Sequence, residues 1–391
     1  MNANIALQLN SVAESVGLKS RVFFHDGDTV GVVSSVAPYG KVAVLYAKNT
    51  FLEEGKEFTT KLKSAGIVPL NFILPEGVAL TPKNVFDVIG VPEDVRAVVY
   101  SDPILTDIAA YLATIFNIPV ICTLKTVYTE NIIGVKLPFF WDDKTDFFDA
   151  RCVYHIVLGE NSESGDIAKQ YINVISKITA LTDYRVKLKT CGGTAEKSAY
   201  GLIKNAVESA LAFNNDLKET LVVAGLKIEL ANLASGGAIL CNSAEYAFKR
   251  LLRFNVDSGT EFAFLEKQLR LYALCAENSE MPFAVPDYNA RATELAGITG
   301  SRDGAFLQGF VDQVAYIKKA DIARIKGEFK TELLSQESAL NIIERQFIKF
   351  GGKKREDFSP YISAFRLCGD MPDTFNFMTL IRESGFTEFI L

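Results

Sequence analysis

The chain has 391 residues, which is enough for two or three domains of ordinary size. Hydrophobic residues make up 49% and charged residues 23%, the balance of a soluble globular protein. The net charge of −6 argues against a nucleic-acid partner, because such proteins carry a basic surface. Only two histidines occur, His25 and His155, and this scarcity argues against any site that needs several of them.

Cysteine spacing and hydropathy predict a cytoplasmic protein with no membrane partner. The six cysteines do not form C-x-x-C pairs, so free thiols are expected rather than a zinc site or a disulfide framework. The first residues lack the basic and apolar segments of a signal peptide. The most apolar long stretch, residues 221–240, is interrupted by Lys227, Glu229 and Asn232, which is typical of a buried helix.

The first 160 residues alternate short apolar runs with amphipathic stretches. Strands are expected at residues 41–47, 66–74, 95–100, 118–123 and 153–158, with helices at 50–64, 84–91 and 107–116. This alternation predicts a parallel sheet covered by helices on both faces. Ligands of such sheets bind beyond the carboxyl ends of the strands.

Helical periodicity dominates the rest of the chain. Apolar residues recur every three or four positions over residues 166–181, 195–213, 217–234, 243–253, 260–276, 303–322, 336–350 and 373–383. The polar stretch Gly159–Gly165 marks the expected boundary. We therefore predict an α/β Rossmann-like domain with a parallel sheet over residues 1–162 and an all-α domain over residues 163–391.

Several segments in the same order along the chain carry a resemblance to a known family. They are Lys48-Asn49-Thr50, VVYSDPILTDIAAY (98–111), IPVICTLKT (118–126), INVISKITALTDYR (172–185) and FNFMTLIRESG (375–385). Together they resemble the sn-glycerol-1-phosphate dehydrogenase branch of the superfamily of iron-containing alcohol dehydrogenases, glycerol dehydrogenases and 3-dehydroquinate synthases. The resemblance implies a dehydroquinate synthase-like fold, NAD or NADP as cofactor, and a homodimer.

The resemblance also implies a divalent metal held by one Asp and two His, and this chain departs from that set. The three ligand positions fall on Asn173, Tyr246 and Ser258. An amide, a protonated phenol and a hydroxyl bring no formal charge to a divalent cation, so no metal is expected. Glu245 and Gly259 remain beside these positions, and a site centred on Glu245 stays open as an alternative.

The two histidines are not expected to replace the missing ligands. His25 lies in the run RVFFHDGD and His155 in the run VYHIVL. Because metal ligation normally needs a cluster of donors, we interpret each as a histidine satisfied by local hydrogen bonds.

The cofactor positions implied by the resemblance are altered in parallel. They fall on Asn49, Thr50, Ser101, Asp102, Pro103, Asp107, Leu124 and Thr126. Where the family has three glycines beside the pyrophosphate, this chain has Ser101-Asp102-Pro103, which adds a negative charge and removes an amide donor. Asp107 also fits an ordinary helix cap. Lys125 either offsets Asp102, binds a substrate phosphate, or is a solvated lysine.

Three classes of function follow. The first is a divergent homologue that keeps the fold but has lost metal-dependent polyol oxidation, and that binds a small molecule in an interdomain cleft or serves as a scaffold. The second is an active NAD(P)-dependent oxidoreductase of a polyol or polyol phosphate, with Lys125, Lys177 or Tyr246 as acid or base in place of the metal. The third, a lyase or cyclase, suffers from the same losses and ranks last.

Overall fold

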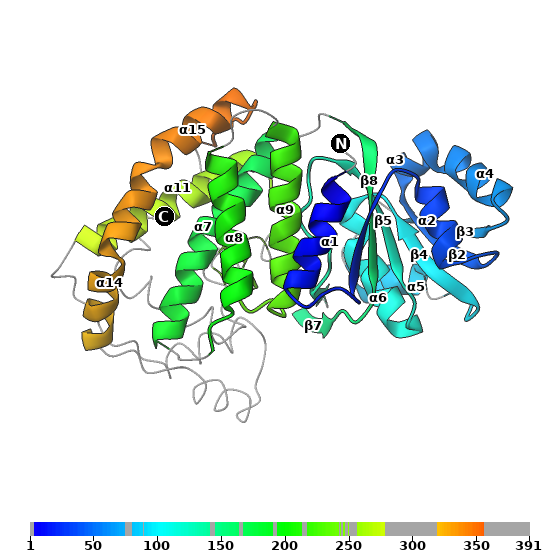
Figure 1. Cartoon of the computed structure of the whole chain (residues 1–391), viewed down its shortest axis with the longest axis horizontal. Coiled ribbons are helices and arrows are strands. Elements are labelled where there is room, and N and C mark those ends of the chain that lie inside the picture. Colours follow the sequence, from blue (N-terminus) through cyan, green and yellow to red (C-terminus); the bar gives the residue numbers. More distant parts are fainter. Residues whose placement is uncertain are drawn as a thin grey trace. The chain divides into compact units, whose positions relative to one another are not determined.

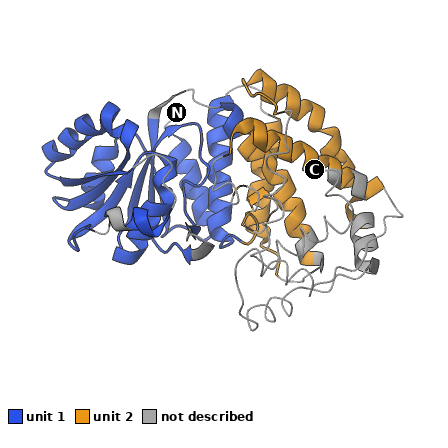
Figure 2. Cartoon of the chain, turned by 180° about the vertical axis from the view of Figure 1, so that it is seen from behind, with its two compact units in different colours: residues 1–170, 213–237 blue, residues 171–212, 238–391 orange. Residues whose placement is uncertain are grey.

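A computed structural model describes residues 4–74, 80–88, 90–140, 145–163, 167–190, 194–212, 217–241, 243, 245–246, 249, 256–277 and 319–355. The chain divides into two compact units (Figure 2). Unit 1 comprises Met1–Gln170 and Phe213–Gly237, and unit 2 comprises Tyr171–Ala212 and Ala238–Leu391.

Unit 1 is built on a parallel sheet of six strands. The strands are β1 (Val22–Asp26), β2 (Lys41–Ala47), β3 (Val68–Leu74), β4 (Val95–Tyr100), β5 (Val120–Thr126) and β8 (Tyr154–Glu163). They pair in the order β1-β8-β5-β4-β2-β3, and every pairing is parallel. The chain leaves β2 toward β3 and leaves β4 toward β5, so the direction of winding reverses between β2 and β4. In sheets of this kind, that reversal creates a crevice at the carboxyl ends of the two strands.

Helices cover the sheet because its central strands are apolar on both faces. All but the first residue of β2 are buried, as expected for a strand inside a parallel sheet. One face packs on α2 (Thr29–Val36) and α4 (Lys56–Ser64), through a core that includes Val33, Leu62 and Val99. The other helices of unit 1 are α1 (Ile5–Ser15), α3 (Lys48–Thr50), η1 (Phe51–Gly55), α5 (Pro82–Val88), η2 (Pro103–Leu105), α6 (Thr106–Phe116) and α9 (Leu217–Ala234) (Figure 1).

A separate antiparallel hairpin joins β6 (Lys136–Phe140) to β7 (Thr145–Asp149). Its Phe139 and Phe148 rings pack edge to face, with centroids 5.5 Å apart, and both contact the ring of Tyr111 on α6. The hairpin therefore belongs to the hydrophobic packing of unit 1.

Unit 2 is helical throughout the residues that the structure describes. Its helices are α7 (Ile167–Thr190), α8 (Lys197–Leu211), α11 (Ser258–Glu277), α14 (Lys319–Ser338) and α15 (Leu340–Lys349), and residues 245, 246 and 249 also have helical backbone. The ring of Phe262 on α11 stacks on Phe347 of α15 at 4.8 Å. Long apolar side chains on several helices thus form a core of the kind expected for a helical domain.

The structure confirms the predicted fold class and refines the elements. β2, β4 and α9 match their predicted bounds, whereas α1, β1, α2 and the β6–β7 hairpin were not predicted. The helix predicted from residue 336 is wrong at its start, because α14 continues to Ser338. Most of the helix predicted at 303–322, all of that at 373–383, and the end of the Gly159–Gly165 boundary segment lie outside the described residues, so the boundary after residue 162 stays a prediction.

Two further expectations concern the thiols and the membrane. Cys122 and Cys152 are buried free thiols, as predicted, and burial raises the pKa of Cys122 to about 12. Among the helices that the structure describes, none is long and apolar enough to cross a membrane.

Candidate functional site

A pocket of about 320 Å³ opens at the carboxyl edge of the sheet in unit 1, which we call the sheet-edge pocket. It lies where the winding reverses between β2 and β4, the usual ligand position in such sheets. Its lining comes from the β1–α2 turn, the ends of β2, β4 and β5, and the face of η1 and α4 that includes Glu54, Glu57, Phe58 and Lys61. The fold therefore retains a binding position of ordinary size for a small molecule.

The β1–α2 turn lines one side of this pocket, and its backbone amides donate hydrogen bonds to the carboxylate of Asp28. Gly27 has φ of +88°, a conformation that favours glycine and that turns the chain sharply after β1. Asp28 then caps α2, with Oδ1 accepting from Val30 N at 2.9 Å and Oδ2 from Gly31 N at 3.1 Å. The amide groups that would attract an anion at this helix N-terminus are already used by Asp28.

The turn after β4 repeats the same arrangement. Asp102 Oδ1 accepts from Ile104 N at 3.1 Å, and Pro103 begins the short helix η2 without an amide proton. Burial raises the pKa of Asp102, while the Ile104 amide and the charge of Lys169 act in the opposite direction. The cap is therefore Asp102 and not Asp107, and it occupies the position where the resemblance would put pyrophosphate.

Both lysines of the sheet-edge pocket pair with carboxylates of the helix that follows β2. Lys125 forms an ion pair with Glu54, and their side chains are 38% and 50% exposed. Lys61 pairs with Glu57 at 2.7 Å, four residues away on α4. With Asp28, the pocket lining has three carboxylates against two ammonium groups, so its charge does not favour a phosphate-rich ligand.

The structure brings together only some of the predicted cofactor residues. Thr50, Ser101 and Lys125 line the sheet-edge pocket. The other predicted positions are not part of its lining: Asn49, Asp102, Pro103, Asp107, Leu124 and Thr126. Asp107 lies in the first turn of α6, and burial raises the pKa of its carboxyl to about 7. The sequence reasoning missed the β1–α2 turn, although Gly27-Asp28-Thr29 has the signal of a glycine turn followed by a cap.

The two histidines of the chain are hydrogen-bonded to each other across β1 and β8. His25 Nε2 lies 3.0 Å from His155 Nδ1, and Phe23 stacks on His155 at 5.0 Å. Burial is the largest influence on both rings; it lowers the pKa of His25 and lowers that of His155 to about 4. Each ring nitrogen in this contact uses the other as its partner, which is consistent with the interpretation of locally satisfied histidines.

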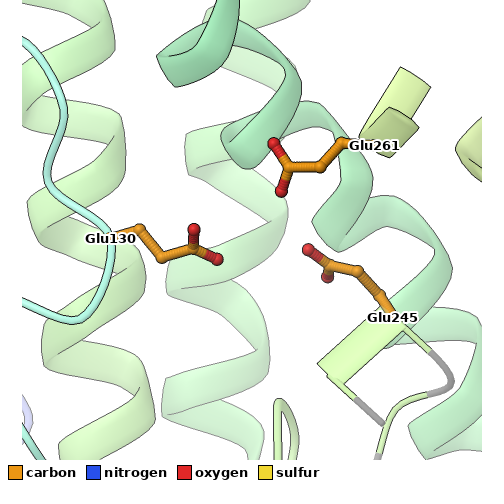
Figure 3. Close-up of side chains that lie close together, drawn as sticks. All are labelled: Glu130, Glu245 and Glu261. Carbon is orange, nitrogen blue, oxygen red and sulfur yellow. The ribbon is translucent and has the colours of Figure 1, made fainter. Parts of the chain in front are cut away.

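Unit 2 contains a second polar site, the buried ion cluster formed by Lys177, Glu245, Lys249 and Glu261. Lys177 on α7 pairs with Glu245. Lys249 pairs with both carboxylates, at 2.9 Å from Glu245 Oε1 and within hydrogen-bond distance of Glu261 on α11. Figure 3 shows the carboxylates of Glu245 and Glu261 turned toward one another, and their nearest oxygens are within 4.8 Å.

The buried ion cluster is desolvated, and its four side chains carry equal numbers of opposite charges. Each of its four side chains is at most 7% exposed. Two ammonium groups face two carboxylates, and Ser176 Oγ also donates to Glu245 Oε1 at 2.8 Å. Buried charges persist in a protein when they are paired in this way.

The three positions where the resemblance implies metal ligands lie on the segments that supply this cluster, and they do not form a metal site. Asn173 lies on α7 one turn before Lys177, and its buried Oδ1 has no hydrogen-bond partner within the described part of the chain. Tyr246 follows Glu245, and Ser258 begins α11. Neutral donors beside two ammonium groups do not suit a divalent cation, so the residues present do not fit the family's metal.

Gly259, which matches the family's pattern, has a structural role of its own. A Cβ atom at this position would lie 2.2 Å from the backbone oxygen of Lys353. The glycine is therefore required by close backbone packing within unit 2, independently of any metal.

No protein-family model matches the chain, and no curated protein matches its sequence. Solved structures do match. A glycerol dehydrogenase from Schizosaccharomyces pombe is 14% identical with a TM-score of 0.50, and the match covers 86% of this chain and 92% of that one. An iron-containing alcohol dehydrogenase from Thermococcus thioreducens is 11% identical with a TM-score of 0.51, covering 94% and 99%. A 1,3-propanediol oxidoreductase is 13% identical with a TM-score of 0.53, covering 95% and 98%.

These matches show the fold. The chain shares the two-part architecture of the iron-containing alcohol and glycerol dehydrogenases over most of its length. At this level of identity the chemistry of a site does not follow from the fold; it depends on the residues that form the site.

Proposed function

We propose that this protein is a small-molecule binding protein on a dehydrogenase fold and has lost metal-dependent polyol oxidation. One observation carries the proposal: after β1 and after β4, the turns that lead into α2 and η2 are capped by the chain's own aspartates, Asp28 and Asp102. Amide groups of these two turns are therefore used by the chain's own carboxylates and are not offered to a dinucleotide's phosphates, while the sheet-edge pocket remains open.

The lining of the pocket favours an uncharged ligand with ring and hydroxyl groups. The rings of Tyr46 and Phe58 offer apolar faces, and Thr50 and Ser101 offer hydroxyl groups. The charged groups of the lining pair with one another, so they are satisfied without a ligand. We propose a ligand of the size of a nucleoside, held by stacking and neutral hydrogen bonds.

A pair of titrations tests this function. Adenosine, an uncharged probe, should bind with a Kd of roughly 1 mM or tighter by calorimetry, whereas NADH and NADPH at roughly 1 mM should show no change in fluorescence. Thr50→Phe fills the pocket and should abolish adenosine binding; Thr60→Phe, on the exposed side of α4, is the matched control. Failure of adenosine to bind, or equal binding to the Thr50→Phe variant, would remove this ligand class.

The alternative is an active NAD(P)-dependent oxidoreductase with altered machinery. It is favoured by the position of the pocket and by the exposure of the Lys125–Glu54 pair, which a phosphate is able to open. In this alternative Lys125, Lys177 and Tyr246 are the acid–base candidates, although Lys177 is buried against Glu245. Tight NADH binding together with turnover of a polyol or polyol phosphate would establish it.

A further inference from the structure

In the buried ion cluster of unit 2, the ammonium group of Lys249 takes the place that a bound cation would have between two carboxylates. Lys249 Nζ lies between two carboxylates from different segments, with Glu245 Oε1 at 2.9 Å and Glu261 on the other side. A divalent ion bound by two carboxylates would occupy the same position, because it also needs oxygen atoms from both.

We propose that Lys249 is a tethered replacement for a divalent cation, and that its ammonium group conceals a latent metal site made of Glu245 and Glu261. This inference does not depend on the ligand of the sheet-edge pocket. It concerns carboxylate oxygens of this chain and not the Asp–His–His set implied by the resemblance.

Neutral oxygens around the cluster support the proposal independently of the acidic pair. Asn173 is 2% exposed, and among the residues that the structure describes its Oδ1 has no hydrogen-bond partner, an unusual state for a buried polar atom. Asn173 precedes Lys177 by four residues on α7, so the two side chains share the helix face that meets Glu245. Ser176, on the same turn, donates to Glu245 from 2.8 Å. Carboxylate, amide and hydroxyl oxygens are a ligand set for hard ions such as Mn²⁺ or Mg²⁺.

Charge explains why the native chain should not bind such an ion. The Lys249 ammonium group already brings a positive charge to both carboxylates, so a divalent ion added beside it would meet a like charge in a buried place. Removing the Lys249 ammonium group frees the place that a divalent ion would take between Glu245 and Glu261. It also leaves the remaining three side chains of the cluster with a net negative charge. Lys177 differs, because it is the ammonium group of Lys249 that pairs with both Glu245 and Glu261.

The test is a Mn²⁺ titration of the full chain, followed by electron paramagnetic resonance of free Mn²⁺ and by thermal unfolding. Lys249→Met should bind one Mn²⁺ with a Kd on the order of 0.1 mM, and its unfolding temperature should rise with Mn²⁺. The native chain and Lys177→Met should show neither effect. Lys204→Met, which removes an exposed lysine paired with Glu208 at the same four-residue spacing, is the matched control.

Two outcomes would overturn the proposal. The first is Mn²⁺ binding by the native chain as tight as that of Lys249→Met. The second is a folded Lys249→Met variant that neither binds Mn²⁺ nor is stabilised by it. If Lys249→Met does not fold alone, circular dichroism decides the question: recovery of helicity on adding Mn²⁺ supports the latent site, no recovery contradicts it, and adding Glu261→Gln should abolish any recovery.

Discussion

The two units treat charge differently. In unit 1, carboxylates occupy helix N-termini and pair with lysines around an open pocket whose ion pairs are partly exposed. In unit 2, two lysines and two glutamates pair with one another and are at most 7% exposed. The chain supplies internal partners in both places, but solvent screens only the first set.

This difference in exposure indicates at which of the two sites a ligand is able to replace an internal ion pair. An exposed ion pair contributes at most about 1 kcal/mol, so a ligand in the sheet-edge pocket competes with a weak internal interaction. A buried pair that loses one partner leaves an uncompensated charge, so the buried ion cluster resists replacement. Binding is thus expected in unit 1, and a structural role for the charged residues in unit 2.

Removing one carboxylate from the buried ion cluster should change the free energy of unfolding more than any other substitution considered. Glu245→Gln removes the carboxylate that pairs with both Lys177 and Lys249, and it leaves buried positive charge without compensation. It should therefore lower the free energy of unfolding by about 3–5 kcal/mol. Urea unfolding measures this change. Glu208→Gln removes a carboxylate that is 63% exposed and is the control in the same unit. Equal costs for the two variants would contradict a buried, interdependent cluster.

The second prediction concerns a buried carboxyl of unit 1 that lacks such compensation. Burial raises the pKa of Asp107 from 3.8 to about 7, so the folded chain binds more protons than the unfolded chain between these values. Stability contributed by this group is therefore lost as the pH rises through that window. Asp107→Asn should be more stable than the native chain at pH 8 by up to about 4 kcal/mol, and equally stable near pH 4.

Urea unfolding at the two pH values checks the Asp107 prediction. His155 has the opposite dependence, because its pKa is lowered to about 4, but it is present in both chains and cancels in the difference. A variant that is less stable at pH 8 would show that the carboxylate is stabilised in the folded chain.

The sequence predicts the architecture well because apolar periodicity is a local property. The strands 41–47 and 95–100 were predicted to the residue, since their continuous apolar runs are buried on both faces of the sheet. The helix α2 escaped prediction because TVGVVSSV is rich in β-branched residues and has weak helical propensity. Its cap, Asp28, and its packing on the sheet decide its conformation.

The site was predictable only in part. The loss of the ligand types at Asn173, Tyr246 and Ser258 is visible in the sequence, and so is the acidic replacement at Asp102. That Lys249 lies between Glu245 and Glu261 is not visible, because three segments must fold before these residues meet. The cytoplasmic location and the homodimer stay predictions.

Removing the exposed ion pair of the sheet-edge pocket should change ligand affinity only slightly. Glu54→Gln removes a carboxylate that pairs with Lys125, so a phosphate should compete more easily for the ammonium group of this lysine. Because an exposed pair contributes about 0.2–1 kcal/mol, inorganic pyrophosphate should bind more tightly by no more than about fivefold, as measured by calorimetry at low salt.

The double variant Glu54→Gln/Lys125→Met tests whether this gain comes from Lys125, and it should bind pyrophosphate no better than the native chain. A gain that persists in the double variant would mean that lower negative charge in the pocket, and not Lys125, produced it. A gain far above fivefold that also extends to NADH would mean that the Glu54 carboxylate alone excludes a dinucleotide. The caps at Asp28 and Asp102 would then be secondary, and an oxidoreductase would become the better account of the fold.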